Sequence, residues 1–197
     1  IQFSVLSPDE IRKSSVAEIT SRDTYINNKP VIGGLFDPRM GVLEPGIICP
    51  TDGLNFMQTP GYFGHIELAR PVFYIQYINT VLKILRCVCF KCSKLKISKI
   101  KHAFIKKVKD GKKRWDYIFK QANKIKRCGN ETTDGCGCKQ PSKIYKEGLA
   151  NVFAEWQNTE KIEGVEDKIR IKLTPESILK IFRRISDEDV AFMGFSP

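Results

Sequence analysis

The sequence has only two histidines in 197 residues and no run of about 18 apolar residues. The second absence excludes an ordinary membrane-spanning helix, so we expect no membrane partner. The first residues, Ile1–Ser4, lack the charged and then apolar pattern of a secretory signal, so we do not expect a secreted protein. Because the chain does not begin with Met, we expect it to be a fragment or to have a disordered start.

The chain also lacks a recognisable catalytic constellation. It has no glycine-rich phosphate loop of the Walker type, and two histidines in these contexts support no Ser-His-Asp set. We expect His65, in a turn beside an apolar stretch, to be a hydrogen-bonded structural residue. His102, among lysines, is expected to be solvated.

Positive charge is the most unusual feature that is present. The formal net charge is +11, from 33 Lys and Arg against 22 Asp and Glu. Between Lys83 and Lys146 there are 20 basic and 4 acidic residues, which leaves 13 basic and 18 acidic residues elsewhere. A strongly basic insert in a mildly acidic body favours a polyanionic partner such as nucleic acid.

Helix signals are clearest at both ends of the chain. Ser7 and Glu10 form a capping box, with Pro8 at the first helical position. The segments beginning at Thr174 and Ser186 start the last two helices, with Gly194 as a stop. Pro71 is expected to start an apolar helix whose stripe is Val72, Ile75, Ile78, Leu82 and Leu85.

Within the basic insert we predict a helical hairpin, residues 98–109 and 114–127, broken at Asp110 and Gly111. Residues 147–156 are read as a short helix and 169–173 as a strand. The expected class is mainly α with short β segments (α+β).

Six of the seven cysteines lie in the basic insert. Cys89 and Cys92 have the CxxC spacing of a chelating turn, and Cys128 can supply a third ligand. Cys136 and Cys138 compete as the fourth, and Cys87 is interpreted as a spare thiol. An odd cysteine count without a secretory signal favours reduced, metal-bound thiols over disulfides. We predict one structural zinc, with free buried thiols or a redox pair as the alternatives.

Basic residues cluster at the tip of the predicted hairpin with a single acid among them. Mutual repulsion costs stability, and a polyanion would relieve it, in largely sequence-independent and salt-sensitive contacts. The predicted nucleic-acid-binding residues are Lys106, Lys107, Lys109, Lys112, Lys113 and Arg114.

Several longer strings resemble the N-terminal region of the largest subunit of multisubunit DNA-directed RNA polymerase, of the eukaryotic RNA polymerase II type or its homologue in large DNA viruses. They cover nearly the whole chain in order. The strings are Ile32–Gly41 (IGGLFDPRMG), Pro60–Phe73 (PGYFGHIELARPVF), Cys87–Cys92 (CVCFKC), Gly135–Pro141, Leu173–Glu176 and Ile185–Asp189 with Gly194 and Phe195.

The resemblance implies an irregular, zinc-stabilised clamp domain. Residues 1–82 and 147–197 would form the clamp core, and residues 83–146 the clamp head with its helical hairpin. It implies Cys89, Cys92, Cys128 and Cys136 as the zinc ligands. The clamp would close over template DNA and the RNA–DNA hybrid, beside other subunits, notably the second-largest.

The full-length subunit would be a nucleotidyltransferase. Its active-site Mg²⁺ and catalytic aspartates would lie beyond residue 197, so this segment carries no catalytic residue and is the front of a longer chain. The implied location is the nucleus, or the virion or cytoplasmic factory of a virus.

One departure from the family pattern concerns the loop around Cys49. A second zinc site of the form Cys-x2-Cys-x6-Cys-x2-His would fall on Cys49, Asp52, Thr59 and Tyr62, and Thr and Tyr are poor zinc ligands. We predict that this loop holds no metal and is held instead by packing of Leu54, Phe56, Met57, Tyr62 and Phe63. The loss suggests a divergent, viral lineage.

Two other readings remain open from the residues. The first is a stand-alone zinc-dependent nucleic-acid-binding module or transcription factor. The second is a structural zinc protein whose basic hairpin docks an acidic protein partner.

Overall fold

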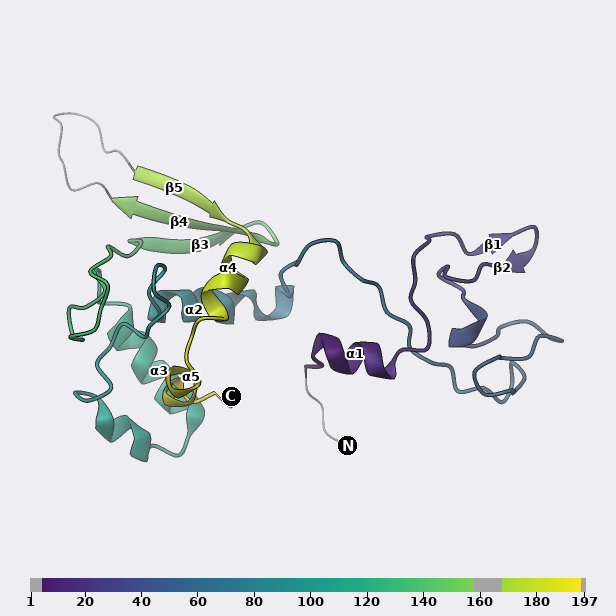
Figure 1. The fold of residues 1–197 in the computed structure, drawn as a ribbon, viewed down its shortest axis with the longest axis horizontal. Helices are drawn as coiled ribbons and strands as arrows, with labels where there is room; N and C mark the ends of the chain where they lie inside the picture. Colours follow the sequence, from purple (N-terminus) through teal and green to yellow (C-terminus); the bar gives the residue numbers. More distant parts are fainter. Residues whose placement is uncertain (1–4, 158–167, 196–197) are drawn as a thin grey trace. The chain divides into compact units, whose positions relative to one another are not determined.

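The structure, a computed structural model, describes residues 5–157 and 168–195 and divides into two compact units (Figure 1). Unit 1 is Ile1–Ala69 and unit 2 is Arg70–Pro197. None of the described helices is long and apolar enough to cross a membrane. Five α-helices and two small sheets among the described residues make the fold a mixed α and β one.

Unit 1 is built mainly from loops. Its regular elements are α1 (Pro8–Ser14), the 3-10 helix η1 (Pro38–Met40) and the antiparallel pair β1 (Tyr25–Ile26) and β2 (Lys29–Pro30). The capping box predicted at Ser7 and Glu10 is confirmed. Asn27 and Asn28, both at positive φ, make the tight turn of the β1–β2 hairpin.

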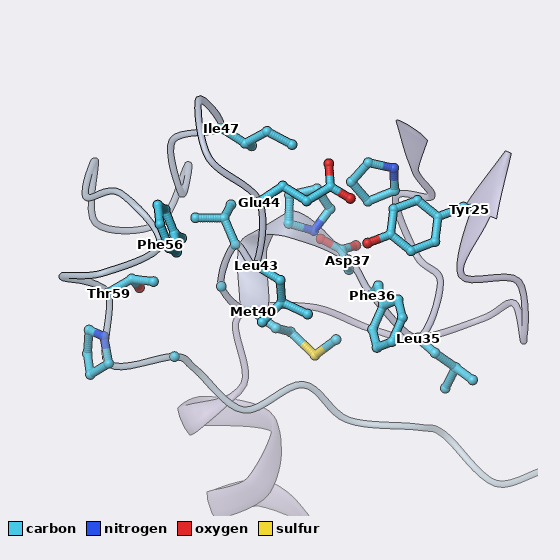
Figure 2. A pocket seen from close by; sticks show the side chains of 16 residues that line it. Tyr25, Leu35, Phe36, Asp37, Met40, Leu43, Glu44, Ile47, Phe56 and Thr59 are labelled. Carbon is cyan, nitrogen blue, oxygen red and sulfur yellow. The ribbon is translucent and has the colours of Figure 1, made fainter. Parts of the chain in front are cut away.

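Asp37 anchors the loop that contains the IGGLFDPRMG string. Its fully buried carboxylate accepts hydrogen bonds from the Gly33 amide at 2.6 Å and from the amide and guanidinium of Arg39. Gly33 has φ +77°, and a Cβ on Gly34 would lie 2.2 Å from the Asp23 carbonyl oxygen. The two glycines are therefore required for the chain to wrap around this carboxylate. Figure 2 shows Asp37 among the residues lining a cavity of about 310 Å³.

The stability of this loop should depend on pH. The Arg39 guanidinium, with the Gly33 and Arg39 amides, lowers the pKa of Asp37 from 3.8 to about 2 despite burial. A lowered folded-state pKa gives stability that is present above about pH 4 and is lost as pH falls through about 2. We expect Asp37→Asn to speed amide exchange of residues 33–39 at pH 5, equivalent to about 1–2 kcal/mol. The difference from wild type should shrink towards pH 2, whereas Asp9→Asn, at an exposed carboxylate, should change little.

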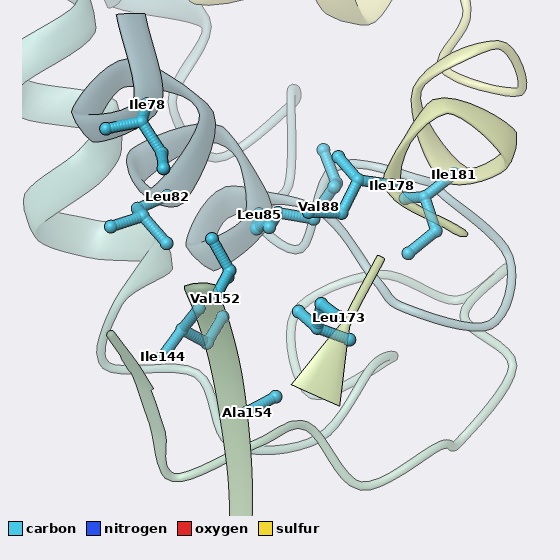
Figure 3. Close-up of a cluster of buried hydrophobic side chains, with 10 residues drawn as sticks. All are labelled: Ile78, Leu82, Leu85, Val88, Ile144, Val152, Ala154, Leu173, Ile178 and Ile181. Atoms are coloured by element: carbon cyan, nitrogen blue, oxygen red, sulfur yellow. The ribbon is translucent and has the colours of Figure 1, made fainter. Parts of the chain in front are cut away.

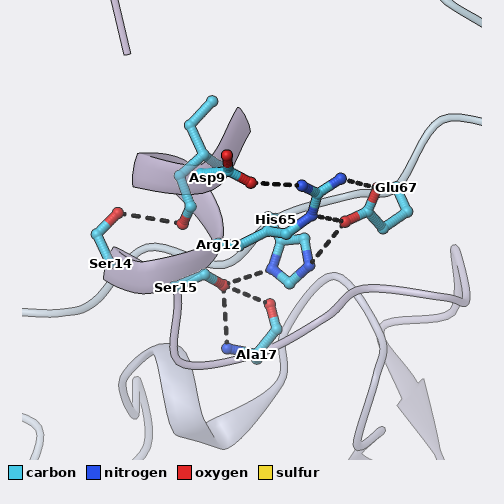
Figure 4. A network of polar contacts seen from close by, with 8 residues as sticks. Asp9, Arg12, Ser14, Ser15, Ala17, His65 and Glu67 are labelled. Atoms are coloured by element: carbon cyan, nitrogen blue, oxygen red, sulfur yellow. Dashed lines mark hydrogen bonds and ion pairs between the residues drawn. The ribbon is translucent and has the colours of Figure 1, made fainter. Parts of the chain in front are cut away.

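A polar network ties α1 to the segment around His65 (Figure 4). The Arg12 guanidinium contacts Glu67 at 2.5 Å and Asp9 at 3.2 Å. His65 Nδ1 lies 2.7 Å from Ser15 Oγ, and its backbone pairs with Ala17 and Ile19. The prediction that His65 is a hydrogen-bonded structural residue is confirmed.

Unit 2 contains the remaining elements. These are η2 (Ile75–Tyr77), α2 (Ile78–Cys87), η3 (Ala103–Lys107), α3 (Gly111–Ala122), β3 (Lys143–Glu147), β4 (Asn151–Gln157), β5 (Lys168–Leu173), α4 (Pro175–Phe182) and α5 (Asp187–Met193). The strands form one antiparallel sheet in the order β3-β4-β5. The predicted strand at 169–173 and the last two helices, with Gly194 as a left-handed cap, are confirmed.

Two buried apolar clusters hold unit 2 together. The first joins α2 and α4 to the inner face of the sheet through Ile78, Leu82, Leu85, Val88, Ile144, Val152, Ala154, Leu173, Ile178 and Ile181 (Figure 3). The second packs α3 and α5 with the segment after α2, through residues that include Trp115, Ile118, Phe192 and Met193. Both clusters combine residues from 83–146 with residues from 147–197.

Three predicted elements are wrong. Residues 147–156 are not a helix: 151–157 form β4, whose Val152 and Ala154 alternate inward with period two. The helix expected at 98–109 is only the 3-10 turn η3, and Ile100 and Phe104 of its expected stripe are exposed. The helix expected from Pro71 begins at Ile78, and Val72 and Ile75 are exposed. The second half of the hairpin is confirmed as a helix, α3, with Trp115, Ile118 and Ala122 buried, but it spans Gly111–Ala122 rather than 114–127.

Candidate metal centre

Four cysteines that are far apart in the sequence come together in unit 2. The Sγ atoms of Cys89, Cys92, Cys128 and Cys136 all lie within 4.8 Å of one another. Cys89 and Cys136 are 3.5 Å apart, and Cys92 and Cys128 are 3.7 Å apart. Tetrahedral zinc with Zn–S bonds of about 2.3 Å requires sulfur pairs about 3.8 Å apart. The donor set and its spacing therefore fit such an ion, and the cluster could hold a metal.

A tight turn presents the first pair of thiols. The Cys89 amide donates to the Lys94 carbonyl and the Ser93 amide donates to the Cys89 carbonyl, both at 2.9 Å, while Val88 pairs with Leu95. Ser93 closes the turn at φ +61°, a conformation rare for residues other than glycine, asparagine and aspartate. No sequence signal at Ser93 predicted this turn geometry.

A close backbone contact between two glycines positions the second pair of thiols, those of Cys128 and Cys136. A Cβ on Gly135 would lie 2.2 Å from Gly129 Cα, so the two backbones can approach this closely only because residue 135 is glycine, while a φ of +93° favours glycine at position 129. This approach folds the chain between Cys128 and Cys136 back on itself. The structure thus brings Cys136, rather than Cys138, to the other three sulfurs. Cys138 instead contributes its carbonyl, which accepts from the Cys128 amide at 2.9 Å.

The electrostatics of the cluster favour a cation. Burial raises the pKa of the Cys128 thiol to about 12 and raises that of Cys92. The Cys138 amide lowers the pKa of the more exposed Cys136 to about 7. Gln140 Nε2 also donates to Cys89 Sγ at 3.2 Å, a contact that stabilises negative charge on sulfur. Because buried thiols ionise with difficulty alone, a divalent cation would supply the charge that keeps all four as thiolates.

Four protein ligands would close the coordination sphere, leaving no position for a substrate or a reactive water. The cluster is thus suited to holding polypeptide together. It joins the turn after α2 to the segment between α3 and β3. The remaining cysteine of this region, Cys87, is a fully buried residue of the second apolar cluster.

The loop around Cys49 is organised by a carboxylate. Asp52 Oδ2 accepts hydrogen bonds from Thr59 Oγ1 at 2.8 Å and Tyr62 Oη at 3.0 Å, and its Oδ1 accepts from the Leu54 amide. Burial opposes ionisation of Asp52, but these hydrogen bonds, with one from Cys49, outweigh it and lower its pKa. The four positions at which the family pattern would have metal ligands therefore form one hydrogen-bonded cluster.

The predicted packing of this loop is wrong in part. Met57 and Phe63 are largely exposed, and Leu54 and Phe56 are also on the surface. Tyr62 contributes through its hydroxyl, and polar contacts to Asp52 replace the expected apolar ones. That the loop holds no metal stays a prediction.

The structure places the basic residues of the predicted hairpin tip around the junction of η3 and α3, from the end of η3 to the first turn of α3, which we call the η3–α3 turn. Lys106, Lys107, Lys109, Lys112 and Lys113 are exposed. Arg114 is different: its guanidinium donates to the carbonyls of Val108 at 2.7 Å and Ala191 at 3.2 Å. Arg114 thus braces the turn, a role the sequence did not predict.

The expectation that His102 is solvated is wrong. The ring is half-buried, with Nδ1 3.0 Å from Tyr117 Oη and Nε2 3.4 Å from a Glu131 carboxylate oxygen. It packs against the rings of Phe104 and Tyr117.

Comparison with known proteins decides the family. The chain matches the family described as RNA polymerase Rpb1, domain 1, over residues 1–197. The chain belongs to the Rpb1 family. It is 42% identical over 203 residues to the DNA-directed RNA polymerase II subunit RPB1 of Euplotoides octocarinatus, covering 99% of this chain and 42% of that protein. It is 36% identical over 208 residues to the DNA-directed RNA polymerase subunit Rpo1N of Methanocaldococcus jannaschii, covering 100% of this chain and 14% of that one.

These matches confirm the resemblance to the N-terminal region of the largest polymerase subunit. The chain spans less than half the length of these two Rpb1 relatives.

Proposed function

We propose that this chain is the clamp of a DNA-directed RNA polymerase and closes over template DNA and the RNA–DNA hybrid during transcription. The main support for this proposal is a group of five exposed lysines in an Rpb1-family chain. They lie around the η3–α3 turn, which Arg114 stabilises through hydrogen bonds to backbone carbonyls. Nucleotidyl transfer would require Mg²⁺ and catalytic aspartates outside residues 1–197. This segment would contribute enclosure of the nucleic acid.

The geometry of the turn supports contact with phosphates. Asp110, the acid within the lysine cluster, accepts hydrogen bonds from the Lys112 and Lys113 amides as the cap of α3, and its carboxylate lies 4.0 Å from Lys113 Nζ. Lys106 also acts on Glu188, whose pKa it helps to lower. Lys106, Lys107, Lys109 and Lys112 form no ion pair with a described acid. Their charge is therefore available to a polyanion, in contacts that depend on salt more than on base sequence.

We infer that the metal of the Cys89 cluster is zinc and that its role is structural. The tetrathiolate donor set is typical of structural zinc. Zinc there would fix the base of residues 83–146, the clamp head, whose tip carries the lysines. Residues 1–82 and 147–197 would form the clamp core.

The rival reading, a stand-alone zinc-dependent transcription factor, is disfavoured because the family match covers the entire chain and both relatives are polymerase subunits. Partners would include other polymerase subunits, notably the second-largest. A viral source stays a prediction. The same holds for a location in the nucleus or a viral factory, because neither relative's name states a compartment.

Photocrosslinking tests the proposed function. A photoreactive residue is placed at Lys107, or at the exposed Lys172 of β5 as a control, in the full-length subunit within its assembled polymerase. We expect Lys107 to crosslink to labelled template or hybrid in a transcribing complex, and Lys172 not to. Crosslinks from Lys107 to protein alone would contradict the clamp function and favour the acidic-partner reading.

A further inference from the structure

A second basic feature of unit 2 lies away from the exposed lysine turn. A cavity of about 430 Å³ opens between the end of α2, the segment after α3 and the start of β3. This volume lies within the usual range for ligand sites, about 300–1,000 Å³. Four cations from four separate chain segments line it: Arg86, Lys96, Lys126 and Lys143. No acidic residue is among the described residues that line it. We call this feature the basic cavity.

Lys96 is the most informative of the four cations. Only 5% of the residue is exposed, and its Nζ donates to the carbonyl of Ile125 at 3.2 Å. An ammonium has three donors, so the bond to Ile125 leaves donor capacity at the cavity wall. Arg86 similarly donates from one Nη to the carbonyl of Ile144, and a guanidinium has five donors.

Within residues 5–157 and 168–195, none of the four cations forms an ion pair with a carboxylate. The thiols of Cys87, Cys89 and Cys128 are close enough to act on the Lys96 charge, and in ionised form they would offset its burial. Four cations around one cavity still repel one another. Hydrogen bonds to backbone carbonyls account for the positions of the Arg86 and Lys96 side chains. They do not explain Lys126 or Lys143, which are exposed and also line the cavity, although the Lys143 ammonium lies 5.2 Å from the centre of the Tyr145 ring.

We propose that the basic cavity binds a phosphate group, presented either by a free polyphosphate or by the backbone of a nucleic-acid strand. Phosphate oxygens accept several hydrogen bonds at once, and a guanidinium with neighbouring ammonium groups matches that acceptor geometry. The amide of Asn123 and the hydroxyl of Ser142 also line the cavity and add neutral donors. This inference does not depend on the clamp function, because it rests on the cavity alone.

Lysine footprinting in the assembled polymerase tests the proposal. The reactivity of Lys126 and Lys143 towards an amine-modifying reagent is measured by mass spectrometry, alone, with inorganic tripolyphosphate, and with a single-stranded DNA oligonucleotide. We expect either anion to protect both lysines at least about fivefold, because a bound phosphate hydrogen-bonds the reacting amines. Protection by tripolyphosphate identifies a free-phosphate site; protection by DNA only identifies a strand-binding site.

A matched pair of variants completes the test. Lys126→Glu with Lys143→Glu reverses two charges of the cavity, whereas Lys124→Glu with Lys146→Glu makes the same change on neighbouring exposed residues that do not line it. The probe that protects should bind about tenfold more weakly to the first variant, and unchanged to the second. Equal weakening by both, protection by neither probe, or lysines already unreactive without a probe would each overturn the proposal.

Discussion

Replacing Cys92 with Ser should remove one zinc per chain and lower the stability of the protein far more than replacing Cys49 or Cys138 with Ser. A structural zinc site contributes about 10 kcal/mol of binding free energy that is coupled to folding, and it does not survive intact without one of four thiolates. Cys92 lies on the turn after α2 and faces Cys128 across 3.7 Å. Loss of the metal should therefore release residues 128–138 from that turn.

Zinc content by elemental analysis, together with thermal unfolding of the full-length subunit, measures both effects. Cys138→Ser is the matched control, because Cys138 is a half-buried thiol of the same loop whose Sγ lies outside the cluster. Cys49→Ser tests the other loop and should leave the zinc content unchanged. Equal destabilisation by Cys92→Ser and Cys49→Ser would contradict the metal assignment, and a loss of zinc in Cys49→Ser would show that the Asp52 loop holds metal.

Replacing the five exposed lysines of the η3–α3 turn with Gln should weaken DNA binding by about a hundredfold at low salt, at about 0.5 kcal/mol per exposed ion pair. The slope of log K against log salt should become less negative by about 0.9 for every lysine that contacts a duplex phosphate. Fluorescence anisotropy at several salt concentrations measures both quantities. Arg114 is left unchanged, because its bonds to backbone carbonyls maintain the turn.

The control for the lysine prediction removes the same charge elsewhere. Lys13, Lys29, Lys172, Lys180 and Arg183 are exposed and lie outside residues 83–146. Changing all five to Gln should alter the salt slope little if the η3–α3 turn makes the contacts. An identical change in slope for the two variants would mean that net charge, and not this turn, attracts DNA.

Local signals explain which elements the sequence predicted correctly. Ser7, Thr174 and Ser186 each cap a helix, because their side chains accept a hydrogen bond from a backbone amide three residues later. Capping depends on contacts between near neighbours, so it is visible in a single sequence. The apolar stripe of α3 was also visible, because Trp115, Ile118 and Ala122 recur at helical spacing on its buried face.

The elements that were predicted incorrectly owe their conformation to contacts with residues far away in the sequence. Residues 151–157 pair with β3 on one side and β5 on the other, and this pairing decides their conformation. Similarly, Leu95 and Ile97 are buried in the second apolar cluster, with the Leu95 amide donating to Asp189 at 3.2 Å. That long-range packing anchors the segment leading into η3, where a helix was expected.

The spacing of the cysteines and the concentration of positive charge in residues 83–146 were properties of the sequence alone, because counting residues is enough to see them. The choice of Cys136 over Cys138 in space, the bracing role of Arg114, the Asp52 cluster and the basic cavity were decided only by tertiary structure. Each depends on atoms brought together across a turn or between segments distant in the chain. No local pattern specifies such contacts, since the free energy that selects them comes from packing of the whole unit.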